Sequence, residues 1–145
     1  MHSFFLLTNK NKKCIIKVIQ LRRGKVNLKL DKSKPICSQI VEFISVGISK
    51  GEFKANERLP SVREVALMAG VNPNTVQKAF EELKGMGLIL SVPSSGWFVS
   101  ENTDIATDMV KKLIKNKTKE YFKEMRLLGK TETEIKEYIK EWENE

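Results

Sequence analysis

Apolar residues recur at intervals of three and four positions ahead of residue 50. They are Ile36, Ile40, Phe43, Ile44 and Ile48. This 3.6-residue period predicts a helix from about Pro35 to Lys50. Proline is favoured as the first helical residue, and Gly51 supplies a residue suited to ending the helix.

Two shorter helices are predicted directly afterwards. Ser61 and Glu64 have the spacing of a capping box, which opens a helix that stops near Gly70. Its inward positions are Val62, Val65, Ala66 and Ala69.

The next helix begins after a tight turn. Asn72 is a favoured N-cap and Pro73 a favoured first residue for it, and it ends around residues 85–87. Its inward positions are Val76, Ala79, Phe80 and Leu83. Two short helices joined by a tight turn have helix-turn-helix spacing.

Two short apolar runs follow these helices. Leu88 to Val92 and Trp97 to Val99 flank the turn residues Pro93 to Gly96, and this pattern predicts a β-hairpin. Three helices followed by a hairpin make a winged helix-turn-helix domain. We therefore expect a mainly α fold with a small β-hairpin, and we assign this domain to residues 31–100.

The C-terminal segment, residues 101–145, shows helical periodicity again. One long helix is predicted from about Thr103 to Leu128, and Thr131 with Glu134 opens a second, shorter helix. The apolar face of the long helix includes Met109, Leu113, Tyr121 and Met125. Such faces require a partner surface. We expect these four residues to form an isologous dimer interface, and the alternative is a site for a small ligand.

The net charge of +8 is unevenly distributed. Residues 1–30 contain eight of the 26 lysine and arginine residues and none of the 18 acidic ones, so residues 31–145 are balanced at 18 of each sign. A DNA-binding role must therefore rest on the placement of charges rather than on their sum. Residues 1–30 have three possible interpretations. They are a basic arm that contacts the DNA backbone, a disordered extension, or an artefact of the assigned start site, in which case translation begins at Val26.

Few residues could support catalysis or metal binding. The single histidine is His2, and no histidine and cysteine cluster exists, so we expect neither enzyme activity nor a metal or cofactor. Cys14 and Cys37 lie in unlike contexts, which favours a reducing compartment. No apolar run is long enough for a membrane helix, and the start is a poor signal peptide. We expect a cytoplasmic protein with no membrane partner.

The helix that begins after Asn72 directs polar side chains outward. Asn74, Gln77 and Lys78 can bond base edges or phosphates, and Thr75 lies near the helix start, the end that contacts bases in recognition helices. An ordinary polar surface is the alternative.

Arg63 lies in the first turn of the preceding helix, where a cation opposes the helix dipole. This placement indicates an external anion such as phosphate, unless Arg63 pairs with Glu64 or another acid.

The chain resembles the GntR superfamily of bacterial regulators. The resemblance rests on the runs from Arg58 to Glu64 and from Gly70 to Leu83, and it covers about residues 31–143. The short helical C-terminal part is similar to the YtrA-like subfamily, whose members dimerise through such helices. The resemblance implies that DNA-contacting residues include Arg63, Asn72, Asn74, Thr75, Gln77 and Gly96, the last as a wing-tip glycine that enters the minor groove. Ser61 and Lys78 complete the set of residues that we expect to bind DNA.

The wing departs from the family pattern. Basic residues around two glycines are usual, but residues 93–99 contain no lysine or arginine, and Ser94 replaces one glycine. This predicts a shallower salt dependence than a basic wing would give. Trp97 is expected to fill the core beneath the wing, and the alternative is an exposed position.

These observations predict a sequence-specific repressor that binds double-stranded operator DNA as a homodimer. The subfamily resemblance implies an operon that contains its own gene and encodes an ABC transporter. An unidentified small-molecule effector is a further expected partner. The alternatives are a DNA-associated accessory factor and a protein–protein adaptor built on a winged helix.

Overall fold

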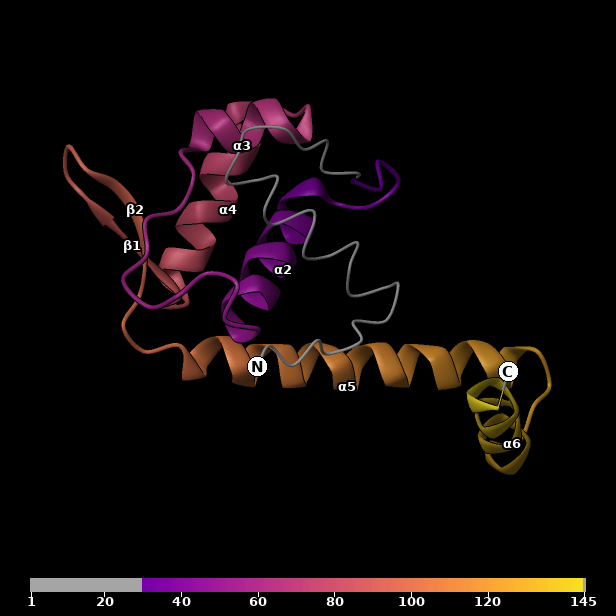
Figure 1. Cartoon of the computed structure of the whole chain (residues 1–145). Coiled ribbons are helices and arrows are strands. Elements are labelled where there is room, and N and C mark those ends of the chain that lie inside the picture. The colour runs from indigo at the N-terminus through magenta and orange to yellow at the C-terminus, as the bar shows by residue number, and fades with distance from the viewer. Residues whose placement is uncertain (1–29, 145) are drawn as a thin grey trace, which may run out of the picture. The chain divides into compact units, whose positions relative to one another are not determined.

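A computed structural model describes residues 30–144 (Figure 1). Residues 1–29 and 145 are not described, so the predictions for the basic N-terminal segment and for Cys14 lie outside it. The elements are α2 (Ile36–Ser49), α3 (Val62–Ala69), α4 (Pro73–Gly85), β1 (Ile89–Val92), β2 (Gly96–Val99), α5 (Asp104–Leu127) and α6 (Glu132–Glu143). The expected mainly helical fold with one hairpin is confirmed. The chain divides after Thr107 into two compact units.

Helix α2 begins one residue later than predicted. Pro35 is its N-cap, with φ −55° and ψ 119°, so the prediction of Pro35 as first helical residue is wrong. The extended ψ keeps Pro35 outside the helix, and Ile36 begins it. At the other end Gly51 has φ +71°, a left-handed conformation that glycine adopts without steric cost.

Helices α3 and α4 begin at the caps that the sequence predicts. The Ser61 hydroxyl accepts from the Glu64 N–H at 3.2 Å, and a Glu64 carboxylate oxygen accepts from the Ser61 N–H at 2.7 Å. Asn72 Oδ1 accepts from the Asn74 N–H at 2.8 Å, and Gly70 ends α3 with φ +64°. These bonds satisfy N–H groups that a helix start would otherwise leave unpaired.

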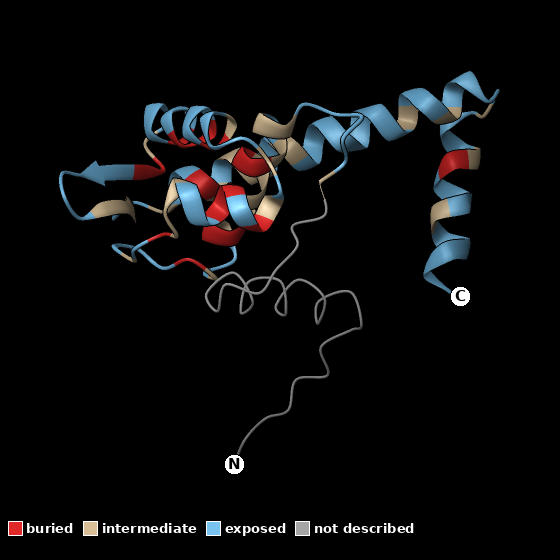
Figure 2. Cartoon of the chain, turned by 90° about the horizontal axis from the view of Figure 1, so that it is seen from above, coloured by how far each residue is buried: buried red, intermediate tan, exposed pale blue. Residues whose placement is uncertain are grey.

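The core of the first unit lies on the inner side of α4. Its four predicted inward residues, Val76, Ala79, Phe80 and Leu83, are all 0% exposed, and α4 packs against α2, α3 and β1. Figure 2 shows the buried residues concentrated where these helices meet.

The inner face of α3 differs from its prediction. Val62 and Ala69 are only half-buried, whereas Met68, which was not predicted to face inward, is buried. Helix α3 has only eight residues, so the residues at its two ends reach the edge of the core.

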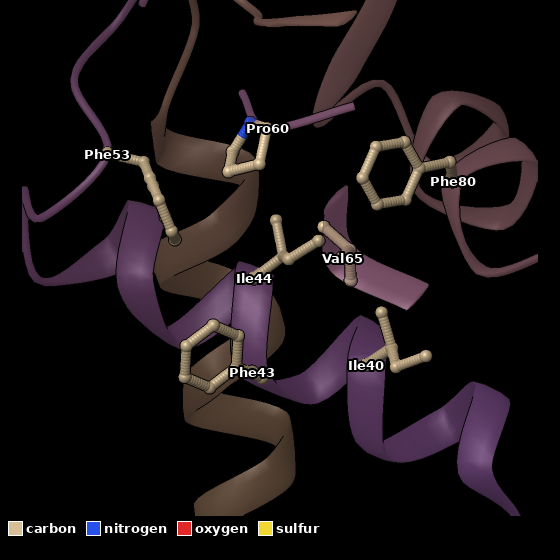
Figure 3. Close-up of a pocket in the computed structure, with 7 residues that line it drawn as sticks. All are labelled: Ile40, Phe43, Ile44, Phe53, Pro60, Val65 and Phe80. Atoms are coloured by element: carbon tan, nitrogen blue, oxygen red, sulfur yellow. The ribbon is translucent and has the colours of Figure 1, made fainter. Parts of the chain in front are cut away.

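A small cavity remains between α2, α3 and α4. Figure 3 shows its lining, in which Ile40, Phe43 and Ile44 of α2 face Val65 of α3 and Phe80 of α4. Its volume is about 10 Å³, which is no more space than one water molecule needs. The cavity is therefore a packing gap in the core.

The hairpin is antiparallel and has a third segment along its edge. Ile89 pairs with Val99 and Val92 with Gly96, so β1 begins one residue later and β2 one residue earlier than predicted. The Leu59 N–H donates to the Trp97 carbonyl at 2.8 Å, and the Val99 N–H donates to the Glu57 carbonyl at 2.9 Å. The segment before α3 is thereby attached to β2 (Figure 1).

Trp97 packs against the core without being fully enclosed. Its ring meets the Phe80 ring edge-to-face, with centroids 5.4 Å apart, and the residue is half-buried. Lys84 Nζ lies 6.0 Å from the ring centroid. The tryptophan therefore covers Phe80 from the hairpin side, and part of its ring remains open to solvent.

The second unit comprises residues 108–144 and contains most of α5 together with α6. Gly129, with φ +81°, lies in the turn between the two helices. The Thr131–Glu134 capping box is present, and Ile135 is fully buried. An ion pair between Arg126 and Glu132 links the two helices.

Candidate nucleic-acid interface

The outward side of α4 carries three exposed polar residues near its start. Asn74, Gln77 and Lys78 are exposed, and Thr75 is half-buried beside them. The Gln77 amide nitrogen donates to Glu81 at 3.0 Å, so Glu81 holds this side chain in place. The inward stripe of α4 fixes the orientation of the helix, and the outward side presents amide and ammonium groups that can bond base edges and phosphates.

Ser61 and Asn72 hold the starts of the two helices. Both side-chain oxygens accept backbone N–H groups in the caps described above. Losing such a cap costs about 1 kcal/mol of stability. These two residues therefore position the starts of α3 and α4, and their contact with DNA stays a prediction.

Arg63 is exposed in the first turn of α3. The sequence left open a pairing with Glu64, but the Glu64 carboxylate bonds to Ser61 instead. Within residues 30–144 the guanidinium of Arg63 makes no ion pair and no hydrogen bond. A guanidinium in this state presents all of its donors to an external anion.

Glu64 follows Arg63 directly in the sequence, and the pKa of its carboxyl is lowered. Hydrogen bonds from the backbone and then the side chain of Ser61 lower the pKa of Glu64, and the charge of Arg58 adds to the effect. The ionised carboxylate is committed to the cap, so it does not neutralise Arg63.

The wing places Gly96 at the base of its turn. Gly96 is the first residue of β2 and pairs with Val92, while Pro93, Ser94 and Ser95 form the tip. Ser94 takes a left-handed conformation with φ +61°. The predicted entry of Gly96 into the minor groove stays a prediction, and the residues nearest the tip are the two serines.

Arg58 is a residue that the sequence did not single out. Its backbone forms an isolated antiparallel β-bridge with Phe98 of β2, and the residue is exposed. The segment around it lacks the alternation typical of strands, so its place beside the wing arises from long-range pairing. The only sequence signal was the position of Arg58 at the start of the run leading into α3.

The residues predicted for dimerisation lie on α5 in the second unit. Met109, Leu113 and Met125 are half-buried, and Tyr121 is 37% exposed. Further large apolar side chains are exposed in this unit: Ile114, Leu127, Leu128, Tyr138 and Trp142.

A shallow groove between α5 and α6 has a different character. It is lined by Phe122 and by Lys119, Lys123 and Lys136, among others. Arg126 and Glu132, which pair with each other, also line the groove, and the small-ligand alternative stays a prediction.

No metal centre or membrane helix is found in the part of the chain that the structure describes. No group of three or more histidine, cysteine, aspartate or glutamate side chains there could hold a metal ion. None of the helices within residues 30–144 is both long and apolar enough to cross a bilayer.

Comparison with known proteins identifies relatives over most of the chain. Residues 37–99 match the family model of bacterial regulatory proteins, gntR family. The uncharacterized HTH-type transcriptional regulator YhcF of Bacillus subtilis is 35% identical over 74% of this chain and 89% of its own length. The HTH-type transcriptional repressor YtrA of the same organism is 36% identical over 75% of this chain and 85% of its own length.

Solved structures agree with these relatives. A GntR family transcriptional regulator from Listeria monocytogenes has 34% identity and a TM-score of 0.68, covering 77% of this chain and 98% of that chain. A transcriptional regulator from Oenococcus oeni has 29% identity and a TM-score of 0.61, covering 79% of this chain and 95% of that one.

Proposed function

Because the chain belongs to the GntR family of bacterial transcription regulators, we propose that it is a repressor which binds operator DNA as a homodimer. The family establishes a DNA-binding regulator and excludes an enzyme. Repression is proposed because the similar protein YtrA is a repressor by name, and the match covers most of both chains. We place its action in the cytoplasm, on an operon that holds its own gene and encodes an ABC transporter.

The observation that carries the DNA-binding surface is the exposed Arg63 in the first turn of α3, which has no ion pair or hydrogen bond to any described residue. Arg63 binds a backbone phosphate, and Asn74, Gln77 and Lys78 contact the bases and phosphates of the adjoining groove. Phosphate contacts set the position of the protein on the duplex, and the amide side chains discriminate between sequences. Ser61 and Asn72 support this surface through their caps, and Thr75 adds a hydroxyl at its edge.

Residues 31–100 form the DNA-binding domain in this proposal, and residues 101–145 form the dimerisation segment. Met109, Leu113, Tyr121 and Met125 contact the same residues of a second copy. A two-fold dimer presents two α4 helices to successive half-sites of one operator. A small-molecule effector would act through the second unit.

A gel-shift experiment tests this proposal. The full chain is mixed with the DNA upstream of its own gene, with excess random duplex as competitor. We expect a shift that survives the competitor, and an Arg63→Ala variant that binds at least about tenfold more weakly, because a charge-assisted hydrogen bond is lost in each protomer.

A matched control removes a cation elsewhere in the same domain. Lys50 is exposed and is the C-cap of α2. Figure 1 shows that the C-terminal end of α2 points away from α3, so Lys50→Ala should bind as the unmodified protein does. Equal binding to upstream and random DNA would contradict sequence-specific regulation and favour an accessory factor. No DNA binding at all would favour an adaptor.

A further inference from the structure

The wing has no positive charge in its own sequence. Residues 93–99 contain no lysine or arginine, yet a hairpin that lies along a duplex approaches a dense row of phosphates. Lys84 is near the hairpin, but it lies over the Trp97 ring and also pairs with Glu81 at 3.7 Å. Arg58 is the cation that borders the other side of β2.

Backbone hydrogen bonds hold Arg58 beside the wing. The bonds from Leu59 to Trp97 and from Val99 to Glu57 lie on either side of it. Arg58 faces Phe98 in the antiparallel bridge, and side chains two residues apart on a strand share a face. Arg58 and position 96 are therefore on the same face of the hairpin, while Trp97 faces Phe80.

Gly96 leaves the space that the Arg58 side chain occupies. A Cβ atom at position 96 would lie 3.3 Å from Arg58 Nε, which is tighter than ordinary van der Waals contact, and 3.5 Å from Nη2, which is an ordinary contact. The backbone there has φ +113°, so glycine is favoured on two grounds. The guanidinium thus lies directly against the backbone of the wing.

The Arg58 guanidinium is available to an external anion. The residue is exposed, and among the described residues it makes no hydrogen bond and no ion pair. The neighbouring acid Glu64 is bound to Ser61.

We propose that Arg58 supplies the positive charge of the wing by binding a DNA backbone phosphate, and that Gly96 serves to admit its guanidinium. This rests on the proposed operator binding, and it adds a contact from the segment before α3. It also gives Gly96 a role through Arg58 rather than through direct entry into the minor groove.

The salt dependence of DNA binding tests the Arg58 contact. The slope of log K against log salt is measured for the full chain on its own upstream DNA and on a random duplex. Each lost phosphate contact reduces the slope by about 0.9, so Arg58→Ala should reduce it by about 1.8 for a dimer. The affinity should fall on both DNAs, because a phosphate contact carries no sequence information. Arg58→Lys should retain most of the slope, and Lys50→Ala should leave it unchanged.

A double-mutant cycle tests the role of Gly96. Gly96→Ala should weaken binding more when Arg58 is present than in the Arg58→Ala background, where only the strain of a side chain at φ +113° remains. An equal loss in both backgrounds would overturn this role. Thermal unfolding checks that each variant is folded, and the Arg58 variants test the contact without any change at position 96.

Arg63→Ala separates failure of this inference from failure of the proposed function. If Arg63→Ala weakens binding and Arg58→Ala leaves the slope unchanged, the Arg58 contact is wrong and the proposed function stands. If neither variant alters binding to either DNA, both are wrong.

Discussion

At the scale of single residues, Arg58 and Glu64 differ in how visible their roles are in the sequence. Glu64 belongs to a local pattern, three residues after Ser61, so its cap could be predicted. Arg58 acquires its position from pairing with β2, forty residues later in the chain. Local hydrogen bonds leave a signature in residue spacing, and long-range contacts of a single side chain do not.

The Glu64 cap predicts how stability changes in acid. Because hydrogen bonds lower the pKa of Glu64 from its usual 4.5, the cap stabilises the fold above that value and is lost as the pH falls through the lowered pKa. The unmodified protein should therefore lose more stability than Glu64→Gln between about pH 5 and pH 3. Urea unfolding followed by tryptophan fluorescence measures this.

A control for the acid experiment is Glu101→Gln, which removes an exposed acid that has no role in a cap. Its pH profile should follow that of the unmodified protein. Identical profiles for Glu64→Gln and the unmodified protein would show that the Glu64 cap contributes nothing to acid sensitivity.

At the scale of elements, most boundaries could be predicted because apolar periodicity and caps are local. Helix α5 was expected from Thr103 to Leu128 and runs Asp104–Leu127. The differences arise where tertiary packing, rather than local sequence, determines which residues are buried and which segments pair. Met68 is buried although the predicted stripe omitted it, and the segment before α3 joins β2 without strand-like alternation.

Gly47 in the last turn of α2 predicts an unusual response to alanine. Alanine normally stabilises a helix relative to glycine by about 0.5–1 kcal/mol. A Cβ at position 47 would, however, lie 2.6 Å from two ring carbons of Phe53, and Phe53 is buried with 2% exposure. We therefore expect Gly47→Ala to reduce the free energy of unfolding by about 1–3 kcal/mol.

Gly85 in α4 provides the matched comparison. No heavy atom lies within 4 Å of a Cβ placed there, so Gly85→Ala should leave stability unchanged or increase it by up to about 1 kcal/mol. Chemical denaturation of both variants gives the two values. Equal stability changes for the two substitutions would contradict the close packing of Phe53 on α2.

At the scale of the whole molecule, the sequence shows apolar faces but not their partners. Helices α5 and α6 bury Ile135 between them, yet Tyr138 and Trp142 remain 50% and 66% exposed. A repeating apolar face indicates that another surface covers it. A single chain does not show which molecule supplies that surface. The dimer is therefore a proposal that needs its own test.

Disrupting the proposed dimer face should weaken DNA binding at a distance. Tyr121→Asp places a charge within that face, so we expect more monomer by sedimentation and at least about a tenfold loss of operator affinity, because half-sites are then bound singly. Lys115→Asp, at another exposed position of α5, is the control and should remain dimeric. A monomeric unmodified protein would contradict the dimer.

Hydroxyl-radical footprinting on the DNA upstream of its own gene tests the central claim most directly. A dimeric regulator that contacts bases through α4 should protect two half-sites related by two-fold symmetry, with centres about 10 bp or a multiple of this apart. Protection spread evenly along the fragment, or no protection at concentrations that shift random DNA, would contradict operator recognition by this surface.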